Sequence, residues 1–160
     1  MNPMQTIPLM GIAMKQAKAL RDSELIRDFC LSKYNKLPQI IIGHNVKKKP
    51  GRDDCPAILI PRMGKIEGED SREFKYFSLV GWMIVNDKEA EDGDIRILKG
   101  LEESDALGQM IYETLCLLNP NYPVSESHYE IDAVEFFPQI VGEMQLNITV
   151  PRTMGMAMKY

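Results

Sequence analysis

With 160 residues, of which 44% are hydrophobic and 26% charged, the chain has the length and composition of one globular domain, not of a disordered, fibrous or disulfide-scaffold protein. A formal net charge of −4 provides no positive field to attract a phosphate backbone, which argues against bulk nucleic-acid binding. No apolar run reaches the roughly 18 residues of a membrane span, and the first residues lack the positive region of a secretion signal, so we expect a cytoplasmic protein without a membrane segment.

Two helical patterns come first along the chain. Leu9 to Leu20 places apolar side chains at helical spacing without an internal proline, which predicts a helix. Asp22 and Ser23 then offer N-cap oxygens to a second helical pattern that runs to Tyr34. The segment fits either two helices or one long bent helix.

Three strands are expected next. A β-branched run, Gln39 to Ile42, predicts the first strand, and Ala57 to Ile60 predicts the second. Phe74 to Val85 is the longest β pattern, and both of its faces are largely apolar. Such a strand requires cover on both sides, by helices on one face and by helices or a neighbouring subunit on the other. The two faces carry Phe74, Tyr76, Ser78, Val80, Trp82 and Ile84 on one side and Lys75, Phe77, Leu79, Gly81, Met83 and Val85 on the other.

Polar connections separate these strands. The first, residues 46–54, combines like charges with a Pro-Gly pair, and the second, residues 64–73, is polar and contains glycine. We expect both connections to be mobile loops, and we expect the ends of the chain, 1–8 and 152–160, to fray. The first loop carries the only concentrated positive charge in the chain, from Lys47, Lys48, Lys49 and Arg52.

The second half of the chain predicts one helix and two more strands. The acidic stretch Asp87 to Asp94 ends the long strand, and Leu101 to Leu118 has a helical apolar stripe. Tyr129 to Phe137 and Ile140 to Val150 are predicted strands on either side of Pro138. This order predicts a single domain over residues 1–160 with an α+β fold, built on one mixed, mainly antiparallel sheet of about five strands with helices packed on one face.

Cysteine usage agrees with a reducing compartment. Cys30, Cys55 and Cys116 are odd in number and widely separated, and each lies in or beside an apolar run. We therefore expect reduced thiols and no disulfide framework.

The sequence lacks the residue patterns typical of catalysis or cofactor binding. No serine stands in a G-x-S-x-G turn, and the glycines match neither the phosphate-binding loop nor the dinucleotide pattern. No two of the five cysteines and histidines are close enough in sequence to form a pair of zinc ligands. We therefore expect no catalytic residue, no cofactor and no metal site. A small enzyme that uses His44 or His128 as a base is one alternative.

Several segments in this order resemble the tail terminator proteins of long-tailed bacteriophages and prophages. They are the Asp22-Ser23-Glu24-Leu25 helix restart, the strand that follows Cys55-Pro56, the long apolar strand through Trp82, the helix from Leu101, and a closing strand ending in Leu146-Asn147-Ile148-Thr149-Val150. The resemblance extends from the first helix to about Pro151. It rests on the order and length of elements and not on an invariant motif.

The resemblance implies a structural protein that forms a ring, by similarity a hexamer, on the head-proximal end of the tail tube. Its partners would be other copies of itself, the tail tube protein and the head connector, and its final location would be the virion tail. The family has no catalytic residues to transfer. A head-tail connector of related fold, or a small nucleic-acid-associated regulator that uses the basic residues of 47–52, is the alternative. The candidate contact residues are Lys47, Lys48, Lys49, Arg52, Glu67, Arg72, Phe77 and Leu79.

Overall fold

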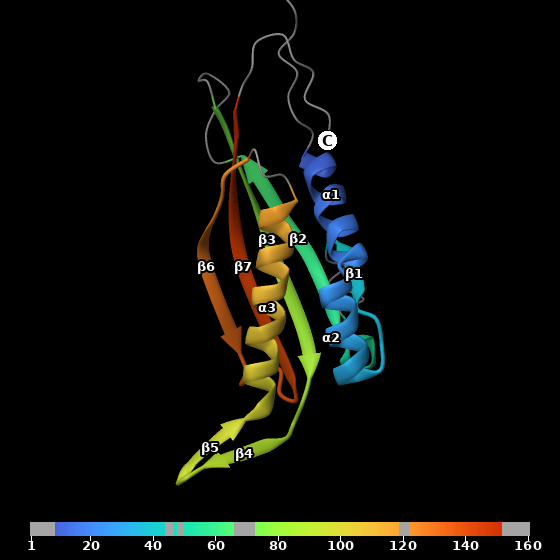
Figure 1. The fold of residues 1–160 in the computed structure, drawn as a ribbon, viewed down its shortest axis with the longest axis vertical. Helices are drawn as coiled ribbons and strands as arrows, with labels where there is room; N and C mark the ends of the chain where they lie inside the picture. Colours follow the sequence, from blue (N-terminus) through green and yellow to red (C-terminus); the bar gives the residue numbers. More distant parts are fainter. Residues whose placement is uncertain (1–8, 44–46, 48–49, 66–72, 119–121, 152–160) are drawn as a thin grey trace, which may run out of the picture.

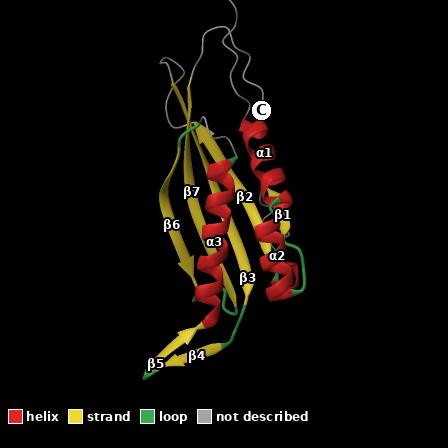
Figure 2. Cartoon of the chain, in the orientation of Figure 1, coloured by secondary structure: helices red, strands yellow, loops and turns green. Residues whose placement is uncertain are grey.

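Three helices lie on one side of a five-stranded sheet (Figures 1 and 2). The computed structural model describes residues 9–43, 47, 50–65, 73–118 and 122–151. The helices are α1 (Leu9–Asp22), α2 (Glu24–Tyr34) and α3 (Lys99–Leu117). The strands of the sheet are β1 (Gln39–Ile42), β2 (Ala57–Lys65), β3 (Glu73–Val85), β6 (Val124–Asp132) and β7 (Gln139–Pro151).

The sheet has the strand order β1-β2-β3-β7-β6. β1 and β2 are parallel, and every other pair of neighbours is antiparallel. The central strands β3 and β7 pair along the full 13 residues of each. This arrangement confirms the predicted α+β fold, with a mixed, mainly antiparallel sheet of five strands and helices packed against it.

Ser23 separates the first two helices. Its hydroxyl accepts a hydrogen bond from the backbone N–H of Ile26 at 3.3 Å, so Ser23 is the N-cap of α2. Asn35 ends α2 in the left-handed conformation, with φ of 56°, and its N–H donates to the carbonyl of Leu31 at 3.0 Å. Of the two options that the sequence leaves open, the structure therefore has two helices.

Trp82 lies at the centre of the core between the sheet and the helices. Its indole Nε1 donates to both the carbonyl oxygen and the hydroxyl of Ser104 on α3, each at 2.9 Å. The ring centroid lies 5.6 Å from that of Tyr129 on β6. Gly108 on α3 and Gly142 on β7 leave room for the indole, because a Cβ at either position would overlap the ring. Trp82 thus fixes α3, β6 and β7 relative to β3.

A second, two-stranded sheet was not predicted. β4 (Glu89–Asp92) and β5 (Ile95–Leu98) form an antiparallel hairpin that projects from the body of the domain (Figure 1). Gly93, with φ of 63°, allows the turn between the strands. None of the hairpin residues, 89–98, is buried. The sequence pattern indicated only an acidic end to the preceding strand, because four of the six residues from Glu89 to Asp94 are acidic and each hairpin strand has only four residues.

Two strand boundaries also differ from the predictions. β6 lies at Val124–Asp132, not at 129–137. Asp132 ends it, because its Oδ1 accepts hydrogen bonds from the backbone N–H groups of Val134 at 2.7 Å and Glu135 at 3.2 Å. β2 continues to Lys65 through a register shift after Leu59, which accommodates a proline within the strand.

Because β2 reaches Lys65 and β3 begins at Glu73, the connection predicted at 64–73 is shorter at both ends. Its remainder, 66–72, lies outside the described residues. Both ends of the chain, 1–8 and 152–160, also lie outside the described residues. So do residues 46, 48 and 49 of the connection predicted at 46–54. The described part of that connection includes a short 3-10 turn, Arg52–Asp54.

Candidate functional site

One face of the sheet is packed against helices, and the opposite face carries no described helix. On β3 the helix-side residues Tyr76, Ser78, Val80, Trp82 and Ile84 are buried. Their neighbours Lys75, Phe77, Leu79, Gly81, Met83 and Val85 point to the other side and are partly exposed. We call this second side the open face. It includes the corresponding positions of the paired strands, which are Val141, Glu143, Gln145, Asn147 and Thr149 on β7 and Ser125, His128, Glu130 and Asp132 on β6.

An apolar stripe runs along the centre of the open face. Phe77, Leu79, Met83 and Val85 lie on the same face of β3, with Gly81 between Leu79 and Met83. The ring of Phe77 lies over Gly64, its cross-strand partner on β2, where an added Cβ would come within 3.0 Å of the ring atom Cζ. A glycine at this position lets the aromatic ring cover the neighbouring strand. Phe77 and Leu79 are the two predicted contact residues that the structure brings together.

The predicted basic contacts are not part of this stripe. Lys47 and Arg52 are exposed in the connection between β1 and β2, whereas Lys48, Lys49, Glu67 and Arg72 lie outside the described residues. Arg52 is followed by two aspartates. Asp54 accepts a hydrogen bond from the N–H of Gly51 at 2.7 Å, so its carboxylate lies within the same turn. In the described part of this connection, acidic groups therefore accompany the positive charge.

Polar side chains occupy the β6 side of the open face. Gln145 donates a hydrogen bond to Asn147 at 3.1 Å along β7. His128 Nε2 lies 3.2 Å from Glu130 Oε2 on the same strand and 3.2 Å from Glu143 Oε1 on β7. Among the described residues, these three side chains bring their ligand atoms within 4.8 Å of one another. Sequence spacing missed this cluster, because strand pairing and not a short motif joins Glu143 to the other two residues.

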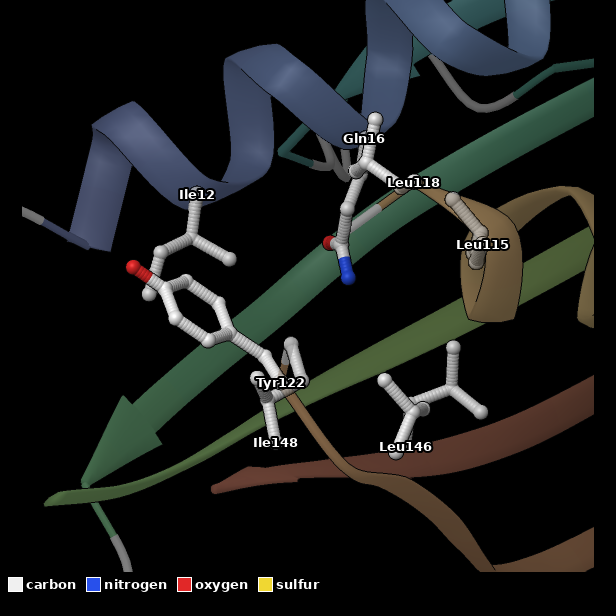
Figure 3. Close-up of a pocket in the computed structure, with 8 residues that line it drawn as sticks. Ile12, Gln16, Leu115, Leu118, Tyr122, Leu146 and Ile148 are labelled. Carbon is white, nitrogen blue, oxygen red and sulfur yellow. The ribbon is translucent and has the colours of Figure 1, made fainter. Parts of the chain in front are cut away.

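A small cavity lies on the opposite, helix-covered side of the sheet (Figure 3). Its volume is about 20 Å³, which is room for about one water molecule. Gln16 enters it from α1, and its Nε2 donates to the hydroxyl of Ser78 at 3.0 Å. Ile12 and Ile148 are among the apolar side chains that surround it (Figure 3). The cavity is too small for an organic ligand.

Two of the three cysteines, Cys30 and Cys55, are buried. Cys30 is fully buried, and burial raises the pKa of its thiol to about 12. Burial also raises the pKa of Cys55, which lies within hydrogen-bonding reach of Gln139 at 3.8 Å. Neither thiol is therefore activated for nucleophilic attack at neutral pH. All three cysteines are free in the structure.

The fold and the open face define this chain as an α+β domain with a one-sided helical layer. No protein-family model matches the chain, and no curated protein matches it. Among the described helices, none combines the length and the apolar character required to cross a membrane.

Proposed function

We propose that this chain is a structural assembly protein that associates with further copies of itself through the open face, as a ring-forming phage tail terminator would. The observation that carries the proposal is the apolar stripe on β3, which the helices leave uncovered. Its side chains are partly exposed, and a large apolar patch on a protein surface marks an association site. In the proposed role, the ring ends polymerisation of a tail tube and presents a surface to a head connector.

The size of the open face suits a stable contact. β3 and β7, with 13 residues, are about 43 Å long, β2 and β6, with nine, are about 30 Å long, and the four strands span about 15 Å. This gives a face on the order of 500 Å², the greater part of the roughly 800 Å² that each partner contributes to a standard interface. The apolar stripe in its middle and polar residues along one side follow the usual order of an interface core and rim.

The sheet edges are less suited to association than its face. β6, one edge strand, carries a register shift between Glu126 and His128 as well as several charged side chains. β1, the other edge strand, is only four residues long. Short, bulged and charged edges discourage the addition of a further strand. Contact between copies is therefore expected across the face.

The β4–β5 hairpin is the segment expected to occupy the open face of the next copy. Isolated two-stranded hairpins are marginally stable, and this one buries none of its residues in its own domain. Residues 89–98 include four acidic side chains and one basic side chain, and Ile95 is 60% exposed. The open face offers the apolar stripe together with two cations: Arg62 on β2, opposite Leu79, and Lys75 near the start of β3. This pairing of different surfaces is head-to-tail, and a head-to-tail contact that closes produces a ring.

Sedimentation velocity over a wide range of protein concentration tests the proposal. The wild-type chain is expected to associate, and Leu79→Glu is expected to remain a monomer, because the charge would be desolvated in the contact. Leu117→Glu is the matched control, since Leu117 is 78% exposed on α3, on the other side of the sheet. A wild-type chain that stays monomeric at every concentration overturns the proposal, as does equal disruption by both variants.

Electron microscopy of the associated wild-type protein tests the ring. Closed rings of uniform size are the expected result. Open filaments would contradict the capping role, because a contact that does not close cannot end the growth of a tube. Ile95→Lys on the hairpin is expected to weaken association at least as much as Leu79→Glu on the open face does. The hairpin takes no part in a symmetric face-to-face dimer, so this result distinguishes the head-to-tail contact from such a dimer.

A further inference from the structure

The cluster of His128, Glu130 and Glu143 presents three ligand atoms toward a common point on the open face. Nε2 of His128 lies 3.2 Å from a carboxylate oxygen of each glutamate. All three side chains are 43–60% exposed, so an ion in solution can reach them. Imidazole nitrogen and carboxylate oxygen are both ligands for zinc and its first-row neighbours.

A β-bulge creates this arrangement. Glu126 pairs with Leu146, but His128 pairs with Gln145, so Ser127 is an extra residue on β6. In an unbroken register, His128 and Glu130 would oppose Met144 and Gly142 and would point into the helix-covered core, because a shift of one residue reverses the face of every side chain. The bulge instead turns both residues onto the open face.

The cluster leaves a charge problem that a cation would resolve. Glu130 and Glu143 are directly opposite each other in the β6–β7 pair, and like charges in that position destabilise a sheet. Nε2 of His128 can carry one hydrogen, so it cannot donate a well-directed hydrogen bond to both carboxylates. A divalent ion bound by all three atoms would neutralise both glutamates at once.

The distances also fit a metal ion. Zinc lies about 2.0–2.1 Å from nitrogen and oxygen ligands in tetrahedral sites, which places neighbouring ligand atoms about 3.3 Å apart. The two His128–glutamate distances, each 3.2 Å, are close to this separation. We propose that His128, Glu130 and Glu143 form a binding site for a divalent transition-metal ion of the zinc type, with water in the remaining position. The site lies on the β6 side of the open face, and the proposal does not rest on ring formation.

Titration of the metal-free full-length chain with Co²⁺ tests the site, because tetrahedral Co²⁺ has characteristic visible absorption. One equivalent is expected to bind, and Zn²⁺ is expected to displace it. His128→Ala and Glu143→Gln are each expected to weaken binding at least about tenfold, because even the loss of a residue that only supports a metal ligand costs about that much. Glu143→Gln keeps the size of the side chain and relieves the opposed charges, so circular dichroism should show an intact fold.

Two variants serve as controls. Glu126→Gln changes a carboxylate on the same strand that points to the other side of the sheet, and His44→Ala removes the other histidine of the chain. Both should bind Co²⁺ as the wild type does. The proposal is overturned if the wild type binds no ion, if binding survives both His128→Ala and Glu143→Gln, or if a cobalt–thiolate band shows that a cysteine holds the ion.

Discussion

The indole ring of Trp82 lies directly against the α-carbon of its cross-strand partner, Gly142. A methyl group on Gly142 would fall well inside van der Waals contact with three atoms of the ring. The same ring is held from the other side by Ser104, which accepts the hydrogen bond of its Nε1. The position of the indole, and with it the distance between α3 and the sheet, therefore depends on the absence of a side chain at residue 142.

Gly142→Ala should consequently destabilise the protein by about 1–3 kcal/mol, the usual range for overpacking a core. Gly81→Ala is a close control, because Gly81 lies on the adjacent strand and faces the open side. A Cβ there would meet only the carbonyl oxygen of Gly142, at an ordinary 3.5 Å. Urea denaturation followed by tryptophan fluorescence measures both variants. Equal free energies of unfolding for the two variants would contradict this account of the core.

The buried side of the sheet could be predicted from the sequence because it follows a simple period. Met144, Leu146 and Ile148 alternate with polar residues on β7, and each is buried as the alternation predicts. The long strand through Trp82 was also evident, since β-branched and aromatic residues fill it. These features depend on local spacing, and local spacing is what a sequence displays directly.

The cluster on the open face depends instead on register. Serine is not a residue type that marks a bulge, so nothing in the sequence identifies Ser127 as the extra residue. Without the bulge, His128 would face the core. His128 lies close to Glu143 because β6 and β7 pair across a turn. The spacing of residues along the sequence does not reveal that pairing. The acidic hairpin was missed because its two strands are only four residues long and acidic side chains dominate the first of them, Glu89–Asp92.

Removal of the β4–β5 hairpin should leave the domain folded. The N–H of Lys99 donates to the carbonyl of Lys88 at 2.9 Å, so the two ends of the hairpin are adjacent. Replacing residues 89–98 by Asn-Gly can close this gap with a tight turn. We expect the free energy of unfolding to change by less than about 1 kcal/mol, because no buried residue is lost. A cooperative thermal transition close to that of the wild type checks the prediction, and loss of the transition contradicts it.

The three thiols should differ in reactivity. Cys116 is partly exposed on α3, whereas Cys30 is fully buried. With the pKa of Cys30 raised to about 12 by burial, only about one molecule in ten thousand carries that thiolate at about pH 8. A disulfide reagent should therefore modify one thiol rapidly and the other two only after unfolding. Cys116→Ser should remove the rapid reaction, and a rapid reaction that persists in this variant would show that the buried thiols are accessible.

The cap of α2 should contribute measurably to stability. Ser23→Ala removes the hydroxyl that accepts the hydrogen bond of Ile26 N–H, and we expect a loss of about 1 kcal/mol. Ser32→Ala is the control, since Ser32 is exposed within the same helix and alanine is the better helix former. Chemical denaturation should show a lower midpoint for the first variant and an unchanged or higher midpoint for the second. The reverse order would exclude a capping role for Ser23.

Stability should fall in alkaline solution, because several buried acids hold their protons more tightly in the folded chain. Burial raises the pKa of Cys30 from 9.0 to about 12. Burial also raises the pKa of Tyr129 above its ordinary value of 10.0, and its hydrogen bond to Asp105 at 2.7 Å raises it further. A group whose pKa is raised on folding contributes its full stabilisation below the pKa of the unfolded chain and loses it as the pH rises toward the folded value.

The free energy of unfolding should thus be level up to about pH 9 and decline from there toward pH 12. Tyr129→Phe lacks the phenol, so it should cost about 1 kcal/mol at neutral pH through the lost hydrogen bond. Above pH 10 it should lose stability less steeply than the wild type, because one of the ionising groups is gone. Urea denaturation at several pH values measures both slopes. Parallel curves for the two proteins would mean that Tyr129 ionises equally in the folded and unfolded chains, and the proposed contribution of its burial would be wrong.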